Sequence, residues 1–168
     1  MPEGKPVRGY LAKPKHAPAK SLPATLWVHA AGVSGDWCRA SASNALRYAK
    51  KGKGVIAIDF NAHGYPEDKP KEYYVELENG ELKDYSIQPL KDKEHFYFRL
   101  MFLRELRALD YVCGLPEWDG KRVLVYGESQ GGAQAEALAG LDSRVGAVVA
   151  NVPAMTDFGG ILQGRQSG

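Results

Sequence analysis

A serine flanked by glycines is the residue of this sequence best suited to carry out chemistry. The run Gly127-Glu128-Ser129-Gln130-Gly131 follows a short apolar run and precedes a segment rich in alanine and glycine. A G-x-S-x-G sequence between a strand and a helix is typical of a sharp turn that exposes a nucleophilic serine hydroxyl. At the start of that helix, the backbone N–H of Gln130 would face a developing oxyanion. We therefore predict that Ser129 is a nucleophile, rather than a solvent-facing serine in a glycine-rich turn.

The two glycines of this motif, Gly127 and Gly131, have a steric role in the prediction. The serine in such a turn adopts an unfavourable backbone conformation, and side chains at the two glycine positions would collide with neighbouring backbone. A second oxyanion donor is expected in the loop that follows the first apolar run, where the sequence is His29-Ala30-Ala31-Gly32. The backbone N–H of Ala31 would complete the hole. His29 is interpreted as a residue that hydrogen-bonds this loop and not as a base.

Four short apolar runs are expected to form the strands that position these loops. Each run is rich in β-branched or aromatic residues and is almost continuously apolar, which is typical of strands covered on both faces in a parallel sheet. Segments with helical spacing alternate with them, which predicts an α/β fold: a mostly parallel sheet with helices on both faces. We expect strands at 24–29, 54–59, 122–126 and 145–151, an edge strand at 7–11, and helices at 37–50, 93–112 and 130–141.

The segment 60–92 breaks this alternation because it is too long for an ordinary loop. We expect a β-hairpin within it, with strands at 74–77 and 81–85 joined at Asn79-Gly80, and its role is left open between a lid and local structure. In the helix that follows, Arg104, Glu105 and Arg107 are expected to face solvent. The apolar face of that helix would consist of Phe98, Phe102, Leu106 and Leu109.

Composition restricts the classes of protein that remain. The 168 residues include 22 Lys+Arg and 20 Asp+Glu, a balance that argues against a nucleic-acid binder, and 44% are apolar, which argues against disorder. No apolar run approaches the roughly 18 residues of a membrane helix, and the polar first ten residues do not read as a signal peptide. Cys38 and Cys113 alone make neither a disulfide scaffold nor a metal site. A single domain over residues 1–168 is expected.

Further segments, in order and at compatible spacing, resemble the acetylxylan esterase/cephalosporin-C deacetylase family, which is carbohydrate esterase family seven of the α/β-hydrolase superfamily. The resemblance implies a serine esterase that removes acetyl groups from acetylated xylan or xylo-oligosaccharides, with neither a metal nor another cofactor. It matches Ser129 to the nucleophile and Gln130 to one oxyanion donor, while Ala31 stands where the family usually has tyrosine. Besides the serine motif, the segments are Asp59-Phe60-Asn61-Ala62-His63-Gly64, Phe96-Tyr97-Phe98-Arg99, Pro116-Glu117-Trp118-Asp119-Gly120, Asp142-Ser143-Arg144-Val145 and Val152-Pro153-Ala154-Met155-Thr156-Asp157.

A general base and an acid that orients it are missing from the expected place. In this superfamily both follow the serine, but none of the 39 residues after Ser129 is a histidine. We therefore expect the chain to be the N-terminal part of a longer esterase, one truncated domain with an insert at about 60–92, and weak or inactive alone. His63 is interpreted as a residue that bonds to backbone. The chain offers two further histidines, His16 and His95, neither expected to act as the base.

Other interpretations stay open beside this one. They are an α/β-hydrolase of another kind, resembling dienelactone hydrolases or peptidases, and a non-catalytic α/β module. The partners expected are an acetylated sugar or a small acetyl ester, with no nucleic acid and no membrane, and a homo-oligomer is compatible with this view. Asp59 is expected to organise the loop after its strand, and Arg99 to anchor the long helix through a buried ion pair.

Overall fold

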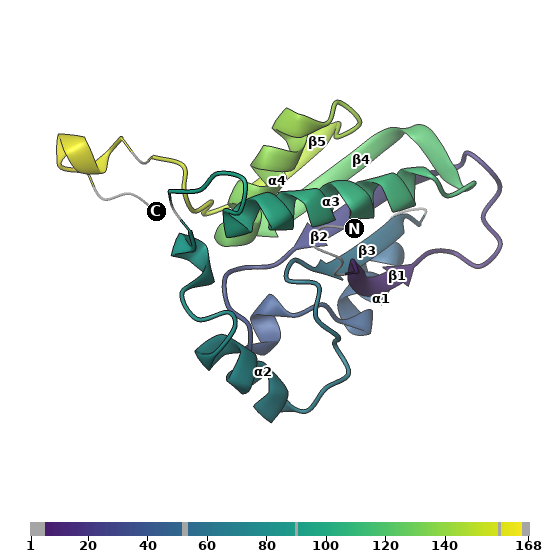
Figure 1. The fold of residues 1–168 in the computed structure, drawn as a ribbon. Coiled ribbons are helices and arrows are strands. Elements are labelled where there is room, and N and C mark those ends of the chain that lie inside the picture. Colours follow the sequence, from purple (N-terminus) through teal and green to yellow (C-terminus); the bar gives the residue numbers. More distant parts are fainter. Residues whose placement is uncertain (1–5, 52–53, 90, 158, 166–168) are drawn as a thin grey trace.

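A five-stranded sheet forms the centre of the protein (Figure 1). The computed structural model describes residues 6–51, 54–89, 91–157 and 159–165. The strand order is β1-β3-β2-β4-β5, in which β1 is antiparallel to β3 and all other neighbours are parallel. The strands are β1 (Arg8–Ala12), β2 (Leu22–Val28), β3 (Ile56–Asn61), β4 (Trp118–Glu128) and β5 (Ala147–Asn151).

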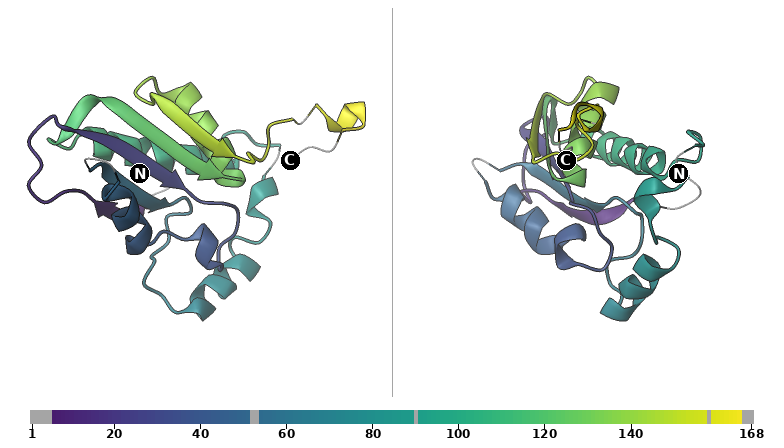
Figure 2. Two further views of the ribbon diagram at one scale, coloured as in Figure 1. Left: turned by 180° about the vertical axis from the view of Figure 1, so that it is seen from behind. Right: turned by 90° about the vertical axis from the view of Figure 1, so that its left-hand side faces the viewer.

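Helices cover both faces of the sheet, as Figure 2 shows. On one face, α1 (Ala42–Ala49) packs against β1 and β3. On the other face lie α3 (Tyr97–Cys113) and α4 (Gln130–Leu141), which also contact each other. The remaining helix, α2 (Lys71–Asn79), lies away from the sheet (Figure 1). The predicted α/β class is confirmed. No helix of the described residues is long and apolar enough to cross a membrane.

The buried strands explain why this sequence forms a sheet. All six residues of β3 are buried, and β2 alternates between buried and half-buried positions. Apolar side chains from the sheet meet those of α3 and α4 in one core, which removes their surface from water. The fully buried members of this core include Leu26, Val28, Ile56, Phe60, Leu109, Val112, Val125 and Leu138.

The five predicted strands are all present, with ends displaced by a few residues, and the helix predicted at 130–141 matches α4 at both ends. The first five residues of the helix predicted at 37–50 are not α-helical. A 3-10 helix, η2 (Asp36–Cys38), is followed by extended backbone at Arg39, and α1 begins only after Ser41. The Ser41 hydroxyl accepts a hydrogen bond from the Asn44 N–H at 3.2 Å and so caps α1.

The predicted hairpin within 60–92 is also wrong. Residues 71–79 form the helix α2, and a second 3-10 helix, η3 (Tyr85–Ile87), follows a short turn. The Asn79-Gly80 pair ends the helix instead of reversing a strand, because the Gly80 N–H donates to the Leu77 carbonyl at 3.3 Å. Five of the nine residues of α2 are lysine, glutamate or leucine, and these good helix formers favour this outcome over the strand pattern.

The long helix α3 is rotated relative to the prediction, and it begins at Tyr97 rather than at 93. Arg104 and Glu105, expected to face solvent, are buried, whereas Arg107 is exposed as expected. Arg104 reaches across to the Ala62 carbonyl, to which its guanidinium donates at 3.2 Å. Arg99 does not anchor the helix from within: its ion pair with Glu94, at 3.5 Å, lies on the surface.

The sheet order determines where a site can form. The chain passes from β2 to β3 on one side and from β3 to β4 on the other side of β2. The chain order therefore reverses at the carboxyl ends of β2 and β4, and in open α/β sheets ligands bind at this point, in the crevice outside the strand ends. The loop after β2 begins at His29, and the turn after β4 contains Ser129.

Candidate active site

Ser129 occupies the turn between β4 and α4 in a strained backbone conformation. Its φ of 52° and ψ of −118° place a non-glycine residue in a region that costs about 1–3 kcal/mol. Two backbone hydrogen bonds hold this conformation: the Ser129 N–H donates to the Asn151 carbonyl at 2.9 Å, and the Ser129 carbonyl accepts from the Ala154 N–H at 2.9 Å. The strain is thus supported by the segment at the end of β5.

Two glycines allow the turn to pack this closely. A Cβ at Gly127 would lie 2.0 Å from the Gly131 carbonyl oxygen. At Gly131 it would lie 2.4 Å from the carbonyl oxygen of Val28 and 2.6 Å from that of His29. All of these atoms belong to backbone, which cannot move aside as the end of a side chain can. The close approach brings the first turn of α4 against the end of β2.

The proposed oxyanion donors lie on these two loops. The N–H of Gln130 is the first of α4, and a helix has no partner of its own for that group. Ala31 is exposed in the loop after β2, and its N–H has no hydrogen-bond partner among the described residues. Such donors, held by the backbone before a reaction starts, can stabilise a tetrahedral oxyanion. The Ser129 hydroxyl likewise has no hydrogen-bond partner in the described part of the chain.

His29 is a structural residue of the loop after β2. Its Nδ1 donates to the Trp37 carbonyl at 3.0 Å, and its Nε2 is bonded to the Asp59 carboxylate. The other carboxylate oxygen of Asp59 accepts from the Ser41 N–H at 3.0 Å. Asp59 therefore organises the loop after β2 and not, as predicted, the loop after its own strand. That second task belongs to Asn61.

The Asn61 side chain shapes the turn after β3. Its Oδ1 accepts from the N–H groups of His63, at 2.8 Å, and Gly64, at 3.0 Å, as in an Asx turn. Its amide group is bonded to Glu67, a carboxyl group whose pKa is raised by burial. This turn places the His63 side chain beside the loop after β2.

His63 is bonded through both ring nitrogens. Nε2 donates to the Gly32 carbonyl at 3.1 Å, since a carbonyl oxygen can only accept. Nδ1 then accepts from the Tyr97 hydroxyl at 2.9 Å. The prediction that His63 bonds to backbone is confirmed. No hydrogen bond joins any histidine to the Ser129 hydroxyl within the described residues.

The remaining histidines and acids lie outside this arrangement. His16 is exposed, and His95 pairs with Asp92 at 2.7 Å on the surface. Asp157 accepts from the Arg165 guanidinium at 3.0 Å. The described residues contain no group of three or more histidine, cysteine or acidic side chains arranged to hold a metal ion.

Sequence analysis missed two side chains of the site, those of Tyr85 and Gln130. The Tyr85 hydroxyl donates to the Gln130 side-chain carbonyl at 2.6 Å and accepts from the Gly32 N–H at 3.2 Å. Burial raises the pKa of Tyr85, so the phenol stays protonated and able to donate at neutral pH. Nothing in the polar run around Tyr85 marks it, because its partners lie 45 and 53 residues away.

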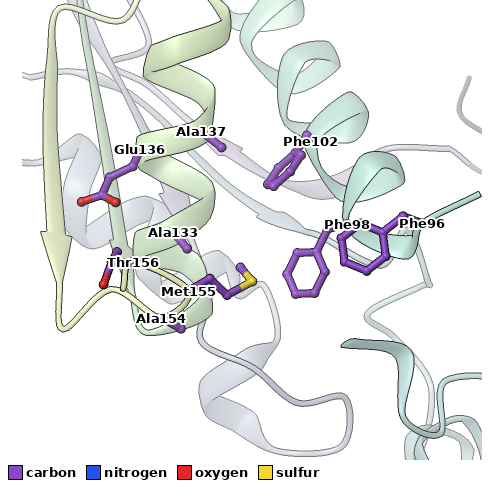
Figure 3. Close-up of a pocket in the computed structure, with 9 residues that line it drawn as sticks. All are labelled: Phe96, Phe98, Phe102, Ala133, Glu136, Ala137, Ala154, Met155 and Thr156. Atoms are coloured by element: carbon purple, nitrogen blue, oxygen red, sulfur yellow. The ribbon is translucent and has the colours of Figure 1, made fainter. Parts of the chain in front are cut away.

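An apolar hollow of about 640 Å³ lies beside the turn, between α3 and α4 (Figure 3). The Met155 side chain extends toward Phe98 across it. Its wall touches the site because the Ala154 N–H is bonded to the Ser129 carbonyl. Its lining residues are Phe96, Phe98, Phe102, Ala133, Glu136, Ala137, Ala154, Met155 and Thr156.

Comparisons with known proteins found a matching family model and several similar proteins. A family model described as Acetyl xylan esterase (AXE1) matches residues 2–167. The acetyl esterase Axe7A of Xylanibacter ruminicola is 37% identical over 171 residues, which cover 96% of this chain and 36% of that protein. The structure of an acetyl xylan esterase from Paenibacillus sp. R4 has a TM-score of 0.74 at 28% identity, over 99% of this chain and 50% of that one.

A second solved structure is similar. Acetyl xylan esterase 1 from Thermoanaerobacterium sp. JW/SL YS485 has a TM-score of 0.64 at 25% identity, over 91% of this chain and 45% of that one. The chain thus spans between about a third and a half of the length of these relatives.

Proposed function

The chain belongs to the acetyl xylan esterase family, and on that premise we propose that it carries the nucleophile and the oxyanion hole of a serine esterase. Ser129 is the proposed nucleophile, and the backbone N–H groups of Gln130 and Ala31 are the proposed oxyanion donors. The observation that carries the proposal is the Ser129 backbone, whose φ of 52° is retained despite its strain at the end of the crevice. Strain of this kind is characteristic of functional sites.

The proposed reaction has two steps. The Ser129 oxygen attacks the carbonyl carbon of an acetyl ester while its proton passes to a general base. The bond between the carbonyl carbon and the sugar oxygen then breaks, the sugar leaves as an alcohol with that proton, and the acetyl group stays on Ser129. Water attacks the acetyl-enzyme next, which releases acetate and restores the hydroxyl. In both steps the donors of Gln130 and Ala31 would stabilise the oxyanion.

The general base is not assigned to His29 or His63. Each of these imidazoles uses both ring nitrogens in hydrogen bonds to other residues, with Trp37 and Asp59 for His29 and with Gly32 and Tyr97 for His63. To accept a proton from Ser129, either imidazole would first have to give up one of these hydrogen bonds.

The proposed substrates are acetylated xylan and xylo-oligosaccharides. Family membership supports an acetylated substrate, and the named relatives are acetyl and acetyl xylan esterases. Ala30 and Ala31 have small side chains, which would leave room for such an ester beside the proposed donors.

The test is hydrolysis of p-nitrophenyl acetate by the protein at its natural full length. We expect Ser129→Ala to lower kcat by more than about 10³-fold, because the nucleophile is lost. Ser143→Ala is the matched control, since Ser143 is an exposed serine in the turn after α4. It is expected to retain the wild-type rate. Equal rates for wild type and Ser129→Ala would refute the assignment.

The substrate class needs its own comparison. Release of acetate from acetylated xylo-oligosaccharides is measured beside hydrolysis of p-nitrophenyl butyrate. We expect efficient release of acetate and weak turnover of the longer acyl chain. A preference for butyrate would contradict the proposed substrate while leaving the role of Ser129 intact.

A further inference from the structure

The three residues 30–32, which include the proposed donor Ala31, have no side chains that could anchor them. Ala30 and Ala31 offer only methyl groups, Gly32 has none, and Ala31 is exposed. A backbone N–H in such a loop can stabilise an oxyanion only if other parts of the protein hold the loop in place. The hydrogen bonds that do so come from residues outside 30–32.

Both peptide groups next to Ala31 on its carboxyl side are held. In the Ala31–Gly32 peptide, the carbonyl accepts from the Trp37 indole N–H at 3.2 Å and the N–H donates to the Tyr85 hydroxyl at 3.2 Å. The carbonyl of Gly32 accepts from His63 at 3.1 Å. The orientation of the peptide that follows the proposed donor is therefore determined in part by Tyr85.

The same Tyr85 hydroxyl contacts the other half of the proposed hole. It donates to the Gln130 side chain at 2.6 Å, and Gln130 is the residue whose backbone N–H is the second proposed donor. The Gln130 amide in turn donates to Gln134 at 3.3 Å, one turn further along α4. One buried oxygen atom thus bonds to both segments that would bind the oxyanion.

We propose that Tyr85 is a positioning residue, whose hydroxyl ties the loop after β2 to the first turn of α4 and so sets the separation of the Ala31 and Gln130 N–H groups. This inference rests on the proposed function. In this view the segment 60–92, which lies outside the sheet, contributes to catalysis by holding the two proposed oxyanion donors in place. In this role Tyr85 would touch neither the substrate nor the reacting atoms.

Contacts around Tyr85 support a fixed position for its ring. The His63 ring meets it edge to face, with centroids 4.8 Å apart, and the Tyr97 ring lies 5.2 Å from it. Besides Tyr85 and His63, a third residue of the segment 60–92 contacts the loop after β2: Glu78 of α2 is bonded to the Ser34 hydroxyl. The support is therefore an ordered cluster rather than a single bond.

The experiment compares Tyr85→Phe with Tyr74→Phe. Tyr74 is a matched control because it is equally part of the segment 60–92, is buried, and also makes two hydrogen bonds through its hydroxyl. It donates to the Pro66 carbonyl at 2.7 Å and accepts from the Lys69 N–H at 3.1 Å, away from the crevice. The two variants should lose a similar amount of stability. An effect on the oxyanion hole should appear in Tyr85→Phe but not in Tyr74→Phe.

Two readouts are used on the full-length protein. The first is kcat and KM for p-nitrophenyl acetate: we expect Tyr85→Phe to lower kcat about tenfold at nearly unchanged KM, since it displaces a donor without removing it. The second is amide hydrogen exchange of the peptide containing residues 29–34, which should exchange faster in Tyr85→Phe than in wild type or Tyr74→Phe. Gln130→Met, which keeps the backbone N–H, should lower kcat in the same way and not additively with Tyr85→Phe.

The outcomes separate the two proposals. An active, Ser129-dependent wild type with Tyr85→Phe as active as Tyr74→Phe would overturn the positioning role alone. Unchanged exchange at residues 29–34 would also overturn it, with or without turnover. A wild type without Ser129-dependent turnover would overturn the proposed function and the positioning role together. If Tyr85→Phe does not fold, a wild-type kcat in Gln130→Met decides against the inference.

Discussion

Glu105 lies within α3 with no exposed surface, and neither of its carboxylate oxygens has a hydrogen-bond partner among the described residues. Burial raises the pKa of Glu105 well above its ordinary value. The folded protein therefore keeps the proton on this carboxyl group at pH values at which the unfolded chain releases it. We predict that Glu105→Gln, which removes the titration and preserves the shape, changes how stability depends on pH.

The magnitude follows from linkage between protonation and folding. Below the ordinary glutamate value of 4.5, the carboxyl group is protonated in both states and the full stability is present. As the pH rises, the unfolded chain ionises first, and the free energy of unfolding falls by about 1.4 kcal/mol for each pH unit in which only the unfolded state is ionised. Between pH 5 and pH 7 this one group removes at most about 2.7 kcal/mol, a large part of a typical domain stability.

The assay is urea unfolding at pH 5, 6 and 7 for wild type, Glu105→Gln and the control Glu76→Gln, in which an exposed glutamate of α2 is changed. We expect Glu105→Gln to gain stability over wild type as the pH rises, while Glu76→Gln follows the wild-type curve. Parallel curves for wild type and Glu105→Gln would refute the argument, because they would mean that Glu105 ionises equally easily in both states.

Two further predictions concern the turn and a buried thiol. Gly131→Ala should destabilise the protein by about 1–3 kcal/mol or prevent folding, because the new Cβ would lie 2.4 Å from the Val28 carbonyl oxygen, whereas Gly140→Ala in the same helix has no atom within 4 Å and should stabilise by about 0.5–1 kcal/mol. Thermal unfolding measures both, and equal melting temperatures would contradict the steric argument. Burial raises the pKa of Cys38 to about 11 from 9.0, so its alkylation by iodoacetamide at pH 8 should be about 100-fold slower than that of an unfolded control peptide. Mass spectrometry follows this rate, and labelling as fast as in the peptide would show that the thiol is accessible.

Local sequence was sufficient for the sheet and for the turn that contains Ser129. The strands are recognisable because buried parallel strands need nearly continuous apolar runs, as in β3, where every residue is buried. The turn is recognisable because a serine between β4 and α4 requires glycines on both sides. Both features depend on residues that are close together in the chain, so a short stretch of sequence is enough to predict them.

The errors occurred where distant residues decide the structure. Because Arg104 and Glu105 are charged, helical periodicity alone predicts that they face solvent. Arg104 is nevertheless buried, where it binds the Ala62 carbonyl 42 residues away. The pair Asn79-Gly80 is compatible with a strand reversal and with a helix end, and the helix-forming residues before it select the second.

The supporting part of the site was hidden for the same reason. Tyr85 lies in a polar run with no motif, and its importance depends on contacts with Gly32 and Gln130 that no local pattern predicts. The proposed backbone donors of Ala31 and Gln130 could be inferred from the sequence, because their place follows from the ends of β2 and β4.

The bonds from Glu78, Tyr85 and His63 to residues 32–34 also bear on how such proteins can change during evolution or design. Surface connections usually tolerate insertions and deletions, because the cost of closing a longer loop grows slowly. Here a deletion between α2 and η3 would shift Tyr85 out of register with Gly32, a backbone partner that no compensating side-chain substitution can move. A chimaera built from two homologues should therefore exchange residues 29–41 and 61–97 as one unit.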